Sequence, residues 1–223
     1  MKKGDLIMDY EKLLELRAIV SDRIDEILKN DDFNLSIDYL KYIHRYIFKD
    51  ILINSGSFRE YNITKGEPIL NYDTVNYTDF HAIEYFLRYD LGLEKQINYH
   101  HLTKEEIAKK IANITSRIWL VHPFSEGNTR TTCIFIEKYL KSKGFEVDNK
   151  IFKDNAVYFR NALVVSNYYN SDYKIHCNEL PLINFYRKAL IDENIELDST
   201  ELFYHCLFQN NKKTLKKKRN KSL

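Results

Sequence analysis

Glycine, proline and cysteine are all scarce in this sequence. Its 223 residues include six glycines and three prolines, too few for the many turns of a β-sandwich or barrel. The cysteines are Cys133, Cys177 and Cys206, an odd and widely spaced set without a CxxC pair. Such a set indicates reduced thiols and favours a cytoplasmic protein.

Long apolar runs are missing as well. No stretch approaches the roughly 20 apolar residues that cross a bilayer. The N-terminal segment MKKGDLIMDYEKLLEL carries acidic residues where a signal peptide has its apolar segment. We therefore expect a cytoplasmic protein with no membrane partner, and the chain is long enough for one large domain.

The net charge of +2 conceals an uneven distribution of basic residues. Residues 212–221, KKTLKKKRNK, contain seven lysines and arginines and no acid, so the rest of the chain carries about −5 (the net +2 less seven). Such a tail either binds a nucleic acid or membrane surface or is a solvated chain end, and the second interpretation is favoured. The mildly acidic body argues against a nucleic-acid partner.

What the sequence does contain is helical periodicity. Apolar residues recur as on one face of an α-helix, and Thr103 with Glu106 forms a capping box. The periodicity predicts helices over residues 8–29, 36–51, 78–91, 103–122, 129–143, 150–169, 179–191 and about 198–209. Residues 53–72 contain Gly56, Gly66 and Pro68, which predicts a β-hairpin or flap. The expected fold class is mainly α, with one small β-hairpin flap.

The segment HPFSEGNTR, residues 122–130, joins two of these helices. Backbone N–H groups at Gly127, Asn128 and Thr129 open the second helix, where they lack intrahelical partners and can bind an anion. Glycine at 127 leaves room for a phosphate to approach. Arg130, in the first turn, can bridge phosphate oxygens.

Two further side chains of this segment complete a catalytic pattern. Glu126 offers a hard oxygen ligand for Mg²⁺, and His122 is the natural general base near neutral pH. Each feature alone has a structural explanation. Their combination within nine residues predicts a nucleotide phosphate site with a base beside it.

The same segment resembles the signature HxFx(D/E)GNxR of Fic-domain proteins. The resemblance extends to residues 41–66, KYIHRYIFKDILINSGSFREYNITKG, which are similar to the family's segment leading into its flap, and to residues 158–169, YFRNALVVSNYY. It implies a protein adenylyltransferase, which transfers AMP from ATP to a protein hydroxyl and releases pyrophosphate. The expected parts are an N-terminal helical extension (1–35), a Fic-like catalytic core (36–192), a C-terminal helix (193–211) and a basic disordered tail (212–223).

The resemblance also implies roles for individual residues. His122 would deprotonate the hydroxyl of a target Tyr, Ser or Thr, and Glu126 would hold Mg²⁺. The nucleotide phosphates would lie against four consecutive residues, namely Gly127, Asn128, Thr129 and Arg130. The flap would dock the target by strand addition through Lys65, Gly66, Glu67, Pro68 and Ile69.

Three further residues have open interpretations. Tyr158 and Asn161 either line an adenine pocket or belong to the core. Arg59 either reaches the active site or forms a salt bridge on the hairpin.

The sequence departs from the family pattern in places that bear on regulation. The family continues GNGRxxR, whereas this chain reads GNTRTTC, so that Cys133 replaces an arginine that contacts the γ-phosphate in the family. Many Fic proteins carry an inhibitory helix with (S/T)xxxE(G/N). Ser21 and Asp25 give a degenerate match, for which coincidence is the favoured explanation. We expect weak autoinhibition or none, and any further inhibition would come from a separate, antitoxin-like protein.

Three functions remain open. The first is AMP transfer from ATP, with Mg²⁺. The second is transfer of phosphate or another nucleotide-derived group by the same loop, because one branch of the family has lysine at the position of Thr129. The third is a nucleotide-binding interaction module without turnover. Intact His122 and Glu126 favour catalysis.

Overall fold

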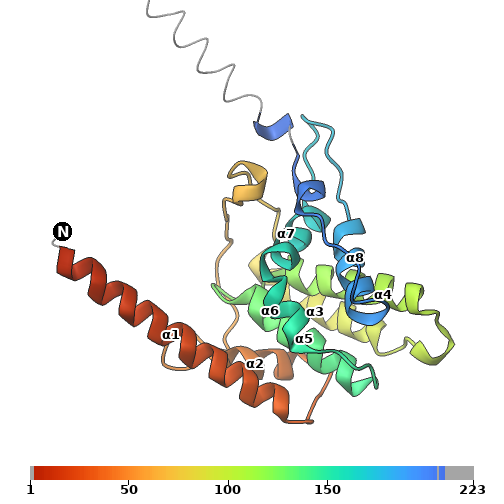
Figure 1. Ribbon diagram of the computed structural model, residues 1–223, viewed down its shortest axis with the longest axis horizontal. Helices are drawn as coiled ribbons and strands as arrows, with labels where there is room; N and C mark the ends of the chain where they lie inside the picture. Colours follow the sequence, from red (N-terminus) through yellow and green to blue (C-terminus); the bar gives the residue numbers. More distant parts are fainter. Residues whose placement is uncertain (1–2, 205, 209–223) are drawn as a thin grey trace, which may run out of the picture.

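The computed structural model describes residues 3–204 and 206–208, and helices make up most of this part of the chain (Figure 1). The mainly α fold class is therefore confirmed. The α-helices are α1 (Lys3–Lys29), α2 (Ile37–Phe48), α3 (Ile83–Glu94), α4 (Lys104–Val121), α5 (Asn128–Ser142), α6 (Asn149–Asp154), α7 (Ala156–Asn167) and α8 (Leu180–Leu190). Short 3₁₀ turns are η1 (Pro68–Leu70), η2 (Phe80–Ala82), η3 (Tyr99–His101) and η4 (Ser199–Leu202).

The predicted helix over 150–169 is divided in two. Asn155 lies between α6 and α7 with φ −114° and ψ 23°, outside helical geometry. Its side chain donates to the carbonyl of Ile151 (2.8 Å), and its own carbonyl accepts from Phe159 (2.8 Å). One residue therefore ends α6 and begins α7, which the apolar spacing did not reveal.

The β-hairpin is not confirmed. Across residues 3–204, the only β-type pairing is an isolated bridge between Asn170 and Ile175. The flap instead turns through η1, and Asn71 and Tyr72 follow in the left-handed region, with φ of 54° and 67°. These two residues reverse the direction of the chain immediately. The backbone amide of Glu67 therefore donates to the carbonyl of Asp73 (2.9 Å), and no ladder of strand hydrogen bonds forms.

Two other expectations concern the C-terminal part. The helix expected over 198–209 is interrupted: a 3₁₀ turn spans Ser199–Leu202, residues 206–208 are again helical, and residues 205 and 209 lie outside the described part. The basic tail, 212–221, also lies outside it. None of the described helices combines the length and hydropathy needed to cross a bilayer.

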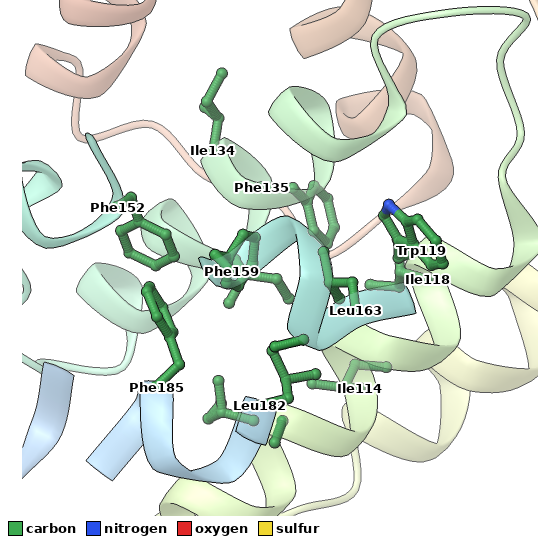
Figure 2. Packing of buried hydrophobic residues seen from close by; sticks show 14 of the residues in the cluster. Ile114, Ile118, Trp119, Ile134, Phe135, Phe152, Phe159, Leu163, Leu182 and Phe185 are labelled. Atoms are coloured by element: carbon green, nitrogen blue, oxygen red, sulfur yellow. The ribbon is translucent and has the colours of Figure 1, made fainter. Parts of the chain in front are cut away.

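Helix α4 lies at the centre of the core and packs against α3, α5, α7 and α8. Figure 2 shows apolar side chains from α4 to α8 meeting in one cluster. The residues labelled there are Ile114, Ile118, Trp119, Ile134, Phe135, Phe152, Phe159, Leu163, Leu182 and Phe185. Because this packing fixes the end of α4 and the start of α5, it positions the segment between them.

Helix α1 lies across α2 and α5 on the outside of this core. Its C-terminal half buries Val20 and Ile27. The N-terminal half projects beyond the other helices (Figure 1), and there Tyr10 and Leu13 are exposed. Only half of α1 is therefore packed on the core.

Candidate active site

His122 ends helix α4 in a strained conformation. It has φ 47° and ψ 58°, the left-handed region that non-glycine residues seldom occupy. The buried guanidinium of Arg59 donates to the carbonyls of His122 (2.8 Å) and Val121 (3.3 Å). Arg59 therefore stabilises the turn that presents the histidine, and its bonds are to backbone carbonyls and not to a hairpin carboxylate.

The His122 ring is held in one tautomer. Its Nδ1 lies 3.2 Å from the carbonyl of Trp119, and because a carbonyl only accepts, Nδ1 carries the proton. Burial first, and then the charges of Lys65, Arg59 and Arg160, lower the pKa of His122 to about 3. The ring is therefore neutral near pH 7, with the lone pair on Nε2 free to accept a proton.

Hydrogen bonds from two side chains shape the loop after His122. Asn128 accepts from the amide of Phe124 (2.9 Å) and donates to its carbonyl (2.7 Å). His44 accepts from the amide of Gly56 at Nδ1 (2.7 Å), so its Nε2 donates to the carbonyl of Glu126 (3.1 Å). The His44 ring also stacks on Phe124 at 3.8 Å.

His44 was missed by the sequence reasoning. The signal was a histidine at helical spacing between Leu40 and Ile47, within the apolar stripe of the second predicted helix.

Gly127 is required by the protein itself. Its φ is +76°, and an added Cβ would lie 2.3 Å from the ring of Phe48. The sequence suggested room for a phosphate as the reason for glycine. In the structure a side chain at position 127 would collide with Phe48, so local packing is the main reason why this residue is glycine.

The start of α5 offers unpaired backbone donors. Its first intrahelical bond runs from the amide of Thr131 to the carbonyl of Gly127 (3.0 Å), so the amides of residues 128–130 lack intrahelical acceptors. The side chain of Thr129 accepts from the indole of Trp119 (2.9 Å). Arg130 stacks on Phe48, 4.8 Å from the ring centre, and burial lowers its pKa.

The flap closes over this loop. Lys65 Nζ lies 3.2 Å from Glu126 Oε1. Glu67 is buried and accepts from Arg160 (2.5 Å) and from the hydroxyl of Tyr77 (3.2 Å). Arg160, on α7, thus ties the flap to the core.

Flap and loop together line a cavity of about 720 Å³. Among its lining residues are most of those singled out from the sequence, namely Lys65, Glu67, Pro68, Ile69, His122, Glu126, Gly127, Asn128, Thr129, Arg130 and Asn161. Trp119, Ala156, Val157, Arg160 and Phe203 complete the lining. Gly66 does not line the cavity. It faces the backbone of the flap, since a Cβ at this position would lie 3.2 Å from the carbonyl of Tyr72.

Three predicted residues lie elsewhere. Tyr158 is buried and donates to the carbonyl of Pro181 (3.2 Å), because it faces α8 while Val157 and Asn161 face the cavity. Ser21 is exposed. Asp25 pairs with Lys153 on α6 (2.8 Å). Tyr158 therefore belongs to the core, and neither Ser21 nor Asp25 reaches the cavity.

Glu126 is the candidate metal ligand. Its side chain is 66% exposed, and no group of three or more His, Cys, Asp or Glu residues that could bind a metal occurs among the described residues. A single accessible carboxylate fits Mg²⁺, which keeps several waters and takes other ligands from phosphate oxygens. It does not fit Zn²⁺, which needs three or four protein ligands.

Comparisons with known proteins agree with this geometry. The sequence model of the Fic/DOC family matches residues 34–140. The chain is 28% identical over 143 residues to the probable protein adenylyltransferase y4lH of Sinorhizobium fredii, covering 64% of this chain and 71% of that protein. It is 26% identical over 112 residues to the protein adenylyltransferase VbhT of Bartonella schoenbuchensis, covering half of this chain but only 22% of VbhT.

Solved structures share the fold. The BepC protein of Bartonella tribocorum, solved with bound AMPPNP, superposes with a TM-score of 0.62 at 19% identity, over 80% of this chain and 86% of that one. The family match and the relatives named as adenylyltransferases support an adenylyltransferase enzyme. The sequence model of the Fic/DOC family thus matches just under half of this chain, and the chain shares its fold with crystal structures of Fic domains.

Proposed function

We propose that this protein transfers AMP from ATP to a hydroxyl group of a target protein. The observation that carries the proposal is that the unprotonated Nε2 of His122 and the N-terminus of α5 line one cavity. A base and an anion site in one cavity are what transfer of a phosphate-linked group to a hydroxyl requires. The adenylyltransferase relatives direct the choice to AMP.

The reaction balances with the residues present. The target hydroxyl oxygen forms a bond to the α-phosphorus, and the bond from that phosphorus to the bridging oxygen of the β-phosphate breaks. The proton passes to Nε2 of His122, and pyrophosphate leaves with the bond's electrons. Backbone amides of residues 128–130 and the Arg130 guanidinium neutralise the charge of the phosphates.

Glu126 would hold Mg²⁺ through one carboxylate oxygen. The ion, when bound, neutralises phosphate charge. In the structure Lys65 Nζ lies 3.2 Å from Oε1 of the same carboxylate, so its positive charge competes with a metal ion for Glu126.

The flap is the proposed docking edge for the target. Pro68 and Ile69 line the same cavity as His122, and an extended peptide laid along the flap would bring a Tyr, Ser or Thr hydroxyl to the base. A separate, antitoxin-like protein remains the proposed source of inhibition, since Asp25 is paired with Lys153 outside the cavity.

Labelled ATP tests the proposal. Protein, Mg²⁺ and a lysate are incubated with ATP labelled at the α-phosphate or, in parallel, at the γ-phosphate. We expect protein-bound label from the α-phosphate alone. Label from the γ-phosphate alone would instead show phosphate transfer, and tight ATP binding without any label would show a binding module.

The variant His122→Ala is the matched control. It should lower the rate of label transfer by roughly 10²–10⁴, because the base is lost, while the affinity for ATP, measured by calorimetry, stays within a few-fold. Transfer at the unmodified rate by this variant would remove His122 from the mechanism.

A further inference from the structure

Helix α1 carries an arginine to the point where α5 begins. Ile24 shares a small cavity of about 150 Å³ with Arg130 and Cys133, and further along, Lys138 donates to the carbonyl of Ile27 (2.9 Å). The two helices therefore run in the same direction. Arg17 lies two turns before Ile24 on the same face, about 10 Å nearer the N-terminus, which places it just beyond the N-terminal end of α5, where an anion bound by the free amides would lie.

The positive charge of Arg17 acts on Arg130, and a single carboxylate, that of Glu126, opposes it. Burial lowers the pKa of Arg130; the carboxylate of Glu126 opposes this shift, and the positive charge of Arg17 adds to it. Glu126 is itself bonded to Lys65. Within the described part of the chain, neither arginine forms an ion pair.

Two like charges near each other raise the free energy of the unliganded protein, and an anion placed between them removes that cost. Cys133 cannot supply a charge of either sign here. Burial raises the pKa of its thiol, so it stays neutral beside Arg130 and Ile24. The site between α1 and α5 is therefore positive, and its second positive charge comes from α1.

We propose that Arg17 binds the terminal phosphates of the nucleotide together with Arg130, so that the N-terminal helix contributes a substrate-binding residue to the active site. This inference rests on the proposed function for the identity of the anion as a nucleoside triphosphate. The exposed side chain of Arg17 is free to turn toward the phosphates, and its guanidinium can bridge two phosphate oxygens.

Nucleotides of different length test the proposal. Affinities for ATP, ADP and AMP are measured by calorimetry on the full chain. The variant Arg17→Ala should weaken ATP binding about tenfold or more and leave AMP binding within twofold, because AMP lacks the terminal phosphates. Arg17→Lys, which keeps the charge, should retain ATP affinity within about threefold. Inorganic tripolyphosphate should compete with ATP on the unmodified protein and much less on Arg17→Ala.

Lys12→Ala is the matched control. It removes one exposed positive charge from α1, farther out and off the face that carries Ile24, and should leave ATP affinity unchanged. Equal ATP affinities for Arg17→Ala and the unmodified protein would overturn the proposal, and so would equal losses of ATP and AMP affinity. A protein whose ATP binding depends on Arg17 but which transfers no label supports this inference and overturns the proposed function. Failure to bind ATP at all overturns both.

Discussion

At His122, separate neighbours set the backbone conformation and the protonation state. Arg59 holds the left-handed turn through the carbonyl of His122, while the carbonyl of Trp119 fixes the proton on Nδ1. Because the ring is buried and surrounded by positive charges, its pKa is about 3. The imidazole is thus unprotonated over the whole neutral range, but a pKa this low also makes it a weak base.

This environment predicts an unusual pH profile. A histidine of ordinary pKa would cost tenfold in kcat/KM for each pH unit below about 6.5. With a pKa of about 3, His122 should leave kcat/KM for ATP level between pH 8 and pH 5. Initial rates over that range measure the profile, and a decline with a midpoint near 6.5 would show that the ring is not held as described.

The stability of the fold must be measured at the same pH values as the rate. The pKa of His44 is lowered by burial to about 4, whereas both histidines titrate near 6.5 in the unfolded chain. Between pH 6.5 and 4 the unfolded chain therefore binds more protons than the folded protein. The stability that the two neutral histidines contribute above pH 6.5 is lost as the pH falls through this range. Circular dichroism at each pH separates loss of fold from loss of the base.

At the scale of elements, the site depends on how α4 is joined to α5. The indole of Trp119 near the end of α4 donates to the hydroxyl of Thr129 in the first turn of α5 (2.9 Å). Trp119 is buried, and the hydroxyl of Thr129 is the acceptor for its N–H. Thr129 is the residue at which this chain departs from the glycine of the family signature, and the bond gives that departure a structural use.

Substitutions of Thr129 separate this bond from the family pattern. Thr129→Gly restores the signature but leaves the buried indole N–H unpaired, which costs about 1–3 kcal/mol; Thr129→Val has the same defect with the side-chain volume kept. Thr129→Ser retains the hydroxyl and should unfold close to the unmodified protein. Urea titration gives the three free energies of unfolding, and equal stability of the Val and Ser variants would contradict the role of the bond.

Helix α1 bears on regulation at the same scale. Asp25 forms an exposed pair with Lys153, and exposed pairs contribute little. Asp25→Ala should therefore raise the transfer rate by no more than about threefold. Lys153→Ala, which breaks the same pair from α6, is the control and should behave alike. A hundredfold increase with Asp25→Ala alone would identify α1 as an inhibitor.

For the whole molecule, the sequence predicted what is encoded over short distances. The periodicity predicted most helices, and the nine residues from His122 to Arg130 could be recognised because they are contiguous. The contacts of His44 with Glu126 and of Arg160 with Glu67 join residues that are 82 and 93 positions apart, and no local pattern encodes them.

The sequence left one interpretation open and led to one prediction that is not confirmed. Helix α7 is apolar on most sides, so its sequence did not show that Asn161 faces the cavity and Tyr158 the core. The flap was expected as a hairpin because of its glycines and proline. Its geometry depends on the left-handed Asn71 and Tyr72, neither of which is a glycine.

The half-packed state of α1 has a consequence for its motion in solution. Backbone amides around Ile24 and Ile27 lie where the helix is packed and should exchange with deuterium slowly, whereas those around Tyr10 and Leu13 should exchange within seconds to minutes as the free end frays. Arg17 lies at the boundary between the two. Saturation with ATP should therefore move the protected boundary about one turn toward the N-terminus, and exchange measured by mass spectrometry should show that shift with ATP but not with AMP.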